Sequence, residues 1–421
     1  MKPVVGSLLL SVAWAAASTA LAESAPAPVD AAPQHAPAAL QEAGGQLSQQ
    51  LPDYRFQAAI MDLESRFGGY AAGLAEQLSG LGAAYQTQGS HLEAAAVLNR
   101  ALHLARINYG LYSPEQIPIL QQLIHNLISS GDYQTADERY DYLYRLQHRI
   151  FGPAAPQMSV AMLERARWEG QAYFLLPDKE TAFGRLLAMW ELYVQVLNRV
   201  IIQEGSFSPN LLEPLHGLLI TQYLISTYAG GQGGGIEVSA GFSRSVPAQG
   251  QFDAVRVSNY RRGQKVLTSL RQLHTHNEPA ASPLPAESLL ELGDWHLWHR
   301  KQTPARLAYQ QAWDELTLLE DREELLQQHF GKPVLLPTLS GYNKDLGAPA
   351  TISGHVEVSF TITENGRVAD LDTINTEWVD GEGRQVSPSK LLRRLRKTIW
   401  RPRFLERVPV TTENMVMRYA F

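Results

Sequence analysis

An internal repeat of 42 residues constrains the fold of this 421-residue chain more than any other feature. An aromatic residue followed by glycine recurs at that interval, at Phe67, Tyr109 and Phe151. The same offset relates further small residues and prolines: Gly89 and Gly131, Ala94 and Ala136, Pro114 and Pro156. A repeat of this length indicates stacked supersecondary units, because a single unit cannot bury its own apolar face.

Each unit has the residue pattern of two packed antiparallel helices. Small residues such as Gly82 and Ala94 let the helices approach, and large ones such as Leu98 fill the space between them. The pattern resembles the tetratricopeptide repeat, and its 42-residue period is similar to the kinesin-light-chain variety. The resemblance implies an α-solenoid over residues 51–330. The residues expected to pack the repeats are Gly82, Tyr85, Gly89, Ala94, Ala101, Gly131, Ala136, Tyr140, Gly293, Ala305, Tyr309 and Ala312.

The repeat pattern blurs between residues 172 and 282. Apolar helices are expected at residues 186–202 and 211–227, and they could be degenerate repeats. A glycine-rich stretch follows at residues 229–250. A phosphate-binding loop would need a preceding strand and a following helix that begins with Lys-Ser/Thr. The sequence contains neither at this place, so a surface loop is the favoured interpretation.

The C-terminal residues alternate between polar and apolar side chains, as in a half-buried strand. Val356, Val358 and Phe360 lie on one face of this strand, and Asn365-Gly366 then predicts a tight hairpin turn. A helix is expected to begin near Pro388, and a closing strand occupies residues 415–421. The expected order is β-β-α-β, after a linker at residues 331–351.

This order resembles the TonB C-terminal domain, over residues 352–421. The best-matched positions are Gly354, Val356, Val358, Phe360, Gly366, Val368, Trp400 and Phe404. An acidic, glycine-containing loop at residues 378–383 departs from the family pattern. TonB C-terminal domains accept an extended segment of an outer-membrane transporter as an added strand. The resemblance therefore implies a partner-binding edge on the last strand, at Met415, Val416, Met417, Arg418 and Tyr419.

Basic residues crowd the predicted helix and the segment after it. Two interpretations stay open: a solvated helix face, or a surface that attracts an acidic protein, lipid head groups or peptidoglycan. The predicted basic patch consists of Arg393, Arg394, Arg396, Lys397, Arg401 and Arg403.

The N-terminus has the features of a secretory signal peptide. Lys2 precedes an apolar run at residues 4–17, and Ala20-Leu21-Ala22 is a cleavage pattern. We expect a signal peptide at residues 1–22, cleaved after Ala22, then a disordered leader rich in Ala, Pro and Gln at residues 23–50. An uncleaved inner-membrane anchor is the alternative. Since the sequence contains no cysteine, it predicts neither a lipidated cysteine nor disulfides.

No catalytic or metal-binding motif in the sequence has the surrounding residues that such a site requires. His296 and His299 are three residues apart and could bind zinc with a third ligand, but a packing role for His296 is favoured. The sequence predicts neither an enzyme nor a cofactor or metal. A net charge of −6 also argues against a nucleic-acid partner.

Together these features predict a multidomain, mainly α protein, in which a tetratricopeptide-type α-solenoid precedes a small α+β domain. The expected function is a periplasmic adaptor that binds other proteins, accessory to a TonB-type transport system. The alternatives are a periplasmic scaffold without a transport role, which could contact peptidoglycan or the outer membrane, and a membrane-retained energy transducer. The transducer is less favoured because the apolar segment has no histidine and ends in a cleavage pattern.

Overall fold

The computed structural model describes residues 38–176, 181–228, 249–338, 355–375 and 389–420. The chain divides into two compact units, Met1–Leu51 and Pro52–Phe421. The predicted signal peptide lies outside the described residues. The predicted leader differs from the structure, because residues 38–50 belong to α1 (Ala38–Phe67). Ala, Leu, Gln and Glu in that stretch are strong helix formers. The prediction of disorder relied on the low aromatic content of the leader and did not take this helix propensity into account.

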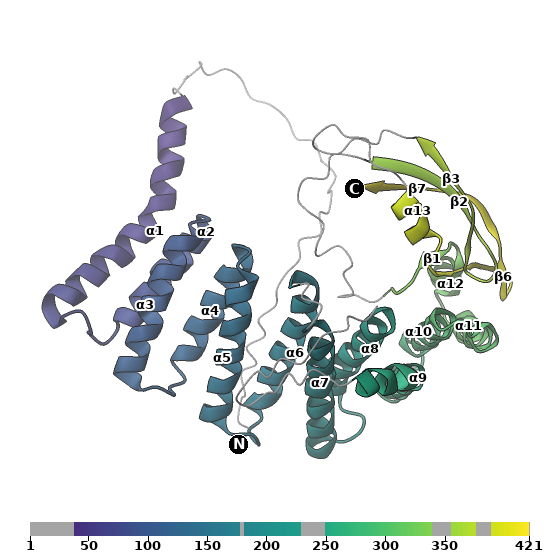
Figure 1. The fold of residues 1–421 in the computed structure, drawn as a ribbon, viewed down its shortest axis with the longest axis horizontal. Helices are drawn as coiled ribbons and strands as arrows, with labels where there is room; N and C mark the ends of the chain where they lie inside the picture. Colours follow the sequence, from purple (N-terminus) through teal and green to yellow (C-terminus); the bar gives the residue numbers. More distant parts are fainter. Residues whose placement is uncertain (1–37, 177–180, 229–248, 339–354, 376–388, 421) are drawn as a thin grey trace, which may run out of the picture. The chain divides into compact units, whose positions relative to one another are not determined.

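The second unit consists mainly of paired antiparallel helices, which confirms a mainly helical fold with stacked repeats (Figure 1). Each helix contacts the next one along the chain from α2 to α11. The pairs in the described residues are α2 (Leu74–Thr87) with α3 (His91–Tyr109), α4 (Gln116–Ser129) with α5 (Tyr133–Phe151), α6 (Gln157–Leu175) with α7 (Ala182–Glu204), α8 (Leu212–Thr227) with α9 (Gln249–Asn277), and α10 (Leu284–Trp298) with α11 (Gln302–Thr317). The segment with the blurred pattern contains the end of α6 and all of α7, α8 and α9, which form two helix pairs of the same kind. Most of the glycine-rich stretch lies outside the described residues.

Two glycines allow paired helices to approach closely. A Cβ placed on Gly82 would lie 2.7 Å from the Leu98 side chain across the α2–α3 pair. A Cβ on Gly293 would overlap the Tyr309 ring across the α10–α11 pair. Any larger side chain at either position would therefore push the two helices apart.

Gly89 and Gly131 do not pack the repeats, which corrects the sequence prediction. A Cβ on either residue would meet nothing within 4 Å. Both residues lie in the turn between paired helices, with φ of 75° and 80°. Glycine recurs at this place in the repeat because the turn requires a left-handed backbone conformation, which glycine adopts without steric cost. The repeat spacing located these residues, but it did not reveal which physical property they supply.

A small β-rich region follows the last helix pair. Its elements are α12 (Arg322–Phe330), β1 (Val334–Leu335), β2 (His355–Ile362), β3 (Val368–Asn375), α13 (Ser389–Leu395), β4 (Trp400–Arg401), β5 (Arg403–Leu405), β6 (Val408–Val410) and β7 (Thr412–Ala420). Three antiparallel strands form a sheet of order β3-β2-β7, while β1 pairs with β4 and β5 pairs with β6. The predicted β-β-α-β order is present, with three short strands between the helix and the last strand.

Part of the predicted linker belongs to the packed core. Residues 331–338 include β1, which pairs with β4, and Leu336 is 1% exposed. Leu336 packs in one apolar cluster with Phe330 and Phe404. The remainder of that linker, residues 339–351, lies outside the described residues. The linker prediction failed at its start because β1 has only two residues, too short for an alternating pattern.

No helix in the described part of the chain is both long and apolar enough to cross a membrane. The apolar run at residues 4–17 is not among the residues covered by that observation.

Candidate functional site

The last strand, β7, lies at an edge of the three-stranded sheet, and β2 is its neighbour among the described strands. From Met415 to Ala420 it pairs with Phe360 to His355 without a register shift. A regular edge strand presents main-chain N–H and C=O groups on its outer side, and these groups can pair with an added strand. The predicted partner-binding residues therefore lie on the straight part of an edge strand.

The side chains of this segment divide between the two faces of the sheet. Met415 and Met417 pack against the apolar cluster of the C-terminal region. Val416 and Arg418 lie on the opposite face and are exposed. The side chain of Tyr419 lies outside the described residues. A segment added to β7 would thus be held mainly through its main chain, with Val416 and Arg418 able to contact its side chains.

The opposite edge of the sheet is less regular. β3 pairs with β2 through two register shifts, whereas β7 has one, which lies before Met415. Bulges of this kind protect sheet edges because they interrupt the row of outward-pointing main-chain groups. Of the two edges in the described sheet, β7 is therefore the better acceptor of an added strand.

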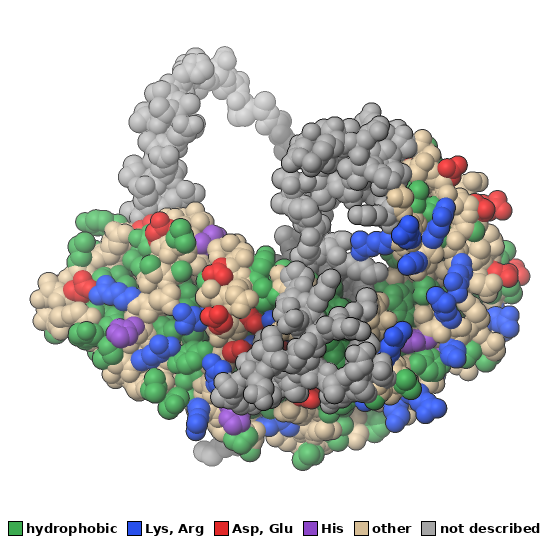
Figure 2. All heavy atoms as spheres, in the orientation of Figure 1, with side chains coloured by type: hydrophobic (Ala, Val, Ile, Leu, Met, Phe, Trp, Pro, Cys, Tyr) green, Lys and Arg blue, Asp and Glu red, His purple; other side chains and the backbone are tan. Residues whose placement is uncertain are grey.

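The predicted basic patch is mostly exposed, as Figure 2 shows for the Lys and Arg side chains of the C-terminal region. Its exposed members are Arg393, Arg394, Arg396, Lys397 and Arg403. Arg401 does not belong to this surface, which corrects the sequence prediction, because it is 5% exposed. It lies on β4 and points into the junction with the helical repeats.

Arg401 joins the C-terminal region to the last helix pair. Its Nε and Nη2 atoms donate hydrogen bonds to the two carboxylate oxygens of Asp294 on α10, at 2.9 and 2.7 Å. Its Nη1 atom donates to the main-chain oxygen of His329, at 3.2 Å. Tyr309 also donates its hydroxyl to Asp294, at 2.8 Å. A bidentate pair of this kind fixes both distance and orientation.

The ionisation of these groups follows from their burial. Burial of the phenol, and then the facing Asp294, raise the pKa of Tyr309 well above its usual value. Burial disfavours the charge of Arg401, but the pKa of its guanidinium is nevertheless raised because Asp294 faces it. Arg401 is therefore a fixed cation and Tyr309 a fixed hydrogen-bond donor. Sequence reasoning missed this pairing, since 107 residues separate the two partners.

A cavity of about 390 Å³ lies beside this junction. Leu297, Arg306 and Tyr309 line it from the helix pair. Asn365 in the β2–β3 turn and Phe404 on β5 line it from the C-terminal region. The lining mixes apolar and polar side chains.

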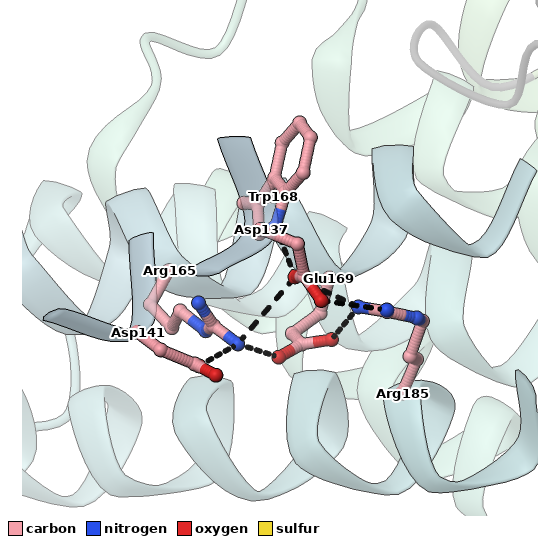
Figure 3. Close-up of polar contacts among 6 residues, drawn as sticks. All are labelled: Asp137, Asp141, Arg165, Trp168, Glu169 and Arg185. Carbon is pink, nitrogen blue, oxygen red and sulfur yellow. Dashed lines mark hydrogen bonds and ion pairs between the residues drawn. The ribbon is translucent and has the colours of Figure 1, made fainter. Parts of the chain in front are cut away.

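A second group of buried charges connects three consecutive helices (Figure 3). Arg185 on α7 donates to both carboxylate oxygens of Asp137 on α5, at 3.1 and 2.8 Å, and to Glu169 on α6, at 3.1 Å. Arg165 on α6 contacts Glu169 and Asp141, each at 2.6 Å. The side chains of Arg165, Arg185, Asp137 and Glu169 are at most 7% exposed.

The buried Trp168 completes this network, since its indole N–H donates to Asp137 at 2.7 Å. Burying these charges is tolerated because each faces an opposite charge with good geometry. The network fixes α6 against α5 of the preceding pair and against its own partner, α7. One sequence signal could have revealed part of this network: Arg165 and Glu169 are four residues apart on one helix face.

The histidines suggested as zinc ligands serve packing. His296 is 5% exposed, and a hydrogen bond of 2.9 Å joins its Nδ1 atom to the Tyr260 hydroxyl. Burial lowers the pKa of His299 to about 4, so its imidazole is neutral, and its ring packs against Trp295. Within the described residues, no group of three or more His, Asp or Glu side chains is placed to hold a metal ion.

Comparisons with known proteins give a limited result. No protein-family model matches the chain. No curated protein matches it. Solved structures that resemble it include BtubC (BKLC) from P. vanneervenii, at 14% identity and a TM-score of 0.39, over 64% of this chain and 89% of that one. A Podosopora anserina protein of the kinesin-light-chain kind, with nearly identical TPR-like repeats, aligns at 15% identity and a TM-score of 0.38, over 57% and 93%. A point variant of it aligns over 57% and 94%.

All three similarities have TM-scores under 0.5, so the repeat architecture rests on the helix pairs of this chain itself. Stacked helix pairs form extended surfaces that are suited to binding other proteins. The resemblance to the TonB C-terminal domain stays a prediction.

Proposed function

We propose that this chain is a non-enzymatic, periplasmic protein-interaction adaptor, accessory to a TonB-type outer-membrane transport system. The observation that carries the proposal is the regular outer edge of β7 from Met415 to Ala420. An extended segment of a transporter can extend the sheet there through main-chain hydrogen bonds. The exposed basic side chains near α13 would attract an acidic segment towards this edge.

The junction with the repeats supports the adaptor role. Because the Arg401–Asp294 pair ties the C-terminal region to the last helix pair, this region is not a domain on a loose tether. A partner bound by the repeats and a segment bound at β7 would then be held in a defined relation. The periplasmic assignment rests on the predicted signal peptide, and the link to transport rests on the resemblance to TonB.

The experiment that tests the proposal is site-directed photocrosslinking in cells. A photoreactive residue replaces Val416 on β7, and the matched control replaces Ile374 on β3, because these side chains are 56% and 55% exposed. We expect Val416 to capture the periplasmic segment of an outer-membrane receptor, identified by mass spectrometry, and Ile374 to capture none. Equal capture at both positions, or capture of cell-wall and assembly proteins alone, would refute the transport adaptor.

A further inference from the structure

Exposed apolar side chains gather along one rim of the helical repeats. This rim, here called the loop rim, contains the ends of α1, α3 and α7 and the loops that join one helix pair to the next. Its main residues are between 45% and 83% exposed: Phe67, Tyr70, Leu111, Tyr112, Ile202 and Phe207. They come from three separate units of the repeat, so the feature is shared between repeats and does not belong to a single loop.

The described part of the opposite rim lacks this property. It is formed by the turns within each pair, among them residues 88–90, 130–132 and 299–301. At these described turns Leu92 is the one large apolar side chain that is exposed. The described connections on both rims are short, so the difference between them is in side-chain chemistry.

The loops of the loop rim are also almost free of charge. Residues 68–73, 110–115, 152–156, 205–209 and 278–283 read GGYAAG, GLYSPE, GPAAP, GSFSP and EPAASP, with Glu115 and Glu278 as the charged residues among them. Charged residues make up 19% of the whole chain. Removing a charge from water without a partner is costly, so a row of uncharged loops can enter an apolar environment at low cost.

The shape of the rim distinguishes between partners. The ends of α3, α5 and α7 lie along one edge of the helix row, at the bottom of Figure 1. Loops at helix ends project as separate tips, and a row of tips can meet a flat surface at many points simultaneously. A groove that could enclose a peptide would require side chains on both sides of the bound segment.

The side chains suit the boundary of a lipid bilayer. Tyrosine has an apolar ring and a polar hydroxyl, and it is enriched where lipid head groups meet acyl chains. Two arginines stand beside rim aromatics: Arg66 lies 5.6 Å from the centre of the Phe67 ring and Arg149 lies 5.9 Å from that of Tyr112. Cations at this level can pair with lipid phosphates while the rings enter the boundary.

We infer that the loop rim docks this protein onto the surface of a lipid bilayer, as a peripheral contact that does not span it. The inference is independent of the proposed strand addition at β7, because it uses none of the same residues. It adds a membrane-binding surface to a protein otherwise expected to bind proteins.

The absence of cysteine from the sequence allows a direct test. Two full-length single-cysteine variants, Tyr112→Cys on the loop rim and Gln88→Cys on the opposite rim, are labelled with an environment-sensitive nitrobenzoxadiazole dye. Vesicles of phosphatidylethanolamine and phosphatidylglycerol are then added. We expect the emission at position 112 to shift to the blue and to rise about twofold or more as the label enters the apolar boundary. The label at position 88 should not respond.

This design separates the rim from the N-terminal apolar segment, because both variants carry that segment unchanged. A second pair, Phe207→Cys and Ser130→Cys, repeats the comparison in other repeats. Equal responses on the two rims, or none at positions 112 and 207, would overturn the inference. A response that rises with protein concentration in the absence of vesicles would also overturn it, since a second copy of the chain would then cover the rim.

Two double variants add a test that needs no label. Tyr112→Ser with Ile202→Ser removes apolar surface from the loop rim, and Leu92→Ser with Val257→Ser removes it from positions elsewhere that are at least as exposed. We expect the first pair to lower the vesicle-bound fraction in flotation, and the second to leave it unchanged. Equal fractions for both pairs would count against the rim.

Discussion

The replacement Arg401→Met tests how firmly the C-terminal region is tied to the repeats. The side chains of Arg401 and Asp294 are 6% and 2% exposed, so both charges are removed from water. Methionine fills much of the volume of the arginine stem but supplies no charge. Asp294 would keep the Tyr309 hydroxyl as a donor and lose both guanidinium contacts.

The expected loss of stability follows from the asymmetry of buried ion pairs. Breaking such a pair by removing one partner leaves an uncompensated buried charge, and we expect the free energy of unfolding to fall by about 3–5 kcal/mol. Adding Asp294→Asn removes that charge and keeps an acceptor for Tyr309, so it should restore about 1–3 kcal/mol. The stability that Asp294→Asn restores in the Arg401→Met background therefore distinguishes charge burial from a loss of packing.

Urea titration followed by tryptophan fluorescence and circular dichroism measures these changes, since Trp400 adjoins Arg401 in the chain. The matched control is Arg407→Met, because Arg407 pairs with Asp314 at 2.7 Å with both side chains about half exposed. It should cost about 0–1 kcal/mol. If Arg401→Met costs no more than this control, or if Asp294→Asn restores nothing, the reasoning about the junction is wrong.

Three further predictions concern packing, pH and charge. Gly82→Leu should lower the free energy of unfolding by about 1–3 kcal/mol in chemical denaturation, because its side chain would overlap Leu98, whereas Gly69→Leu, with nothing within 4 Å, should not. Burial, and then Asp294, raise the pKa of Glu291 to about 7. Ionised Glu291 therefore destabilises the folded state above that pH. Below the pKa of this carboxyl in the unfolded chain, Glu291 is protonated in both states and has no such effect. Glu291→Gln should stabilise by about 1–3 kcal/mol near pH 8 and change little near pH 4, and equal effects at both would refute the shift. Replacing the exposed basic residues Arg393, Arg394, Arg396 and Lys397 by alanine should leave the melting temperature unchanged. It should reduce the salt dependence of binding to an acidic partner, and undiminished binding would show that these residues form a solvated face only.

The sequence predicted those features whose cause is local. The 42-residue period fixed the existence of helix pairs, because each pair repeats the same large and small residues at the same spacing. Asn365-Gly366 predicted the β2–β3 turn, where Gly366 has a positive φ of 71°. The closing strand predicted at residues 415–421 corresponds to β7, which spans Thr412–Ala420.

The sequence could not show what depends on contacts between distant segments. Arg401 lies in a run of basic residues that all read alike, and only the docking of β4 against α10 separates it from its exposed neighbours. The network around Asp137 has the same origin, since its members come from three helices. Gly89 illustrates a different limit. A glycine can be required for close packing or for a positive φ, and the repeat spacing does not distinguish these two causes.

The sequence by itself therefore determined that this chain forms repeated helix pairs followed by a small β-rich region, since helix and strand periodicities are properties of neighbouring residues. The tertiary structure decided which charges are buried, which edge of the sheet is regular and where apolar side chains stay exposed. These properties depend on what each side chain meets after the helices stack, and residues far apart in the chain supply those contacts.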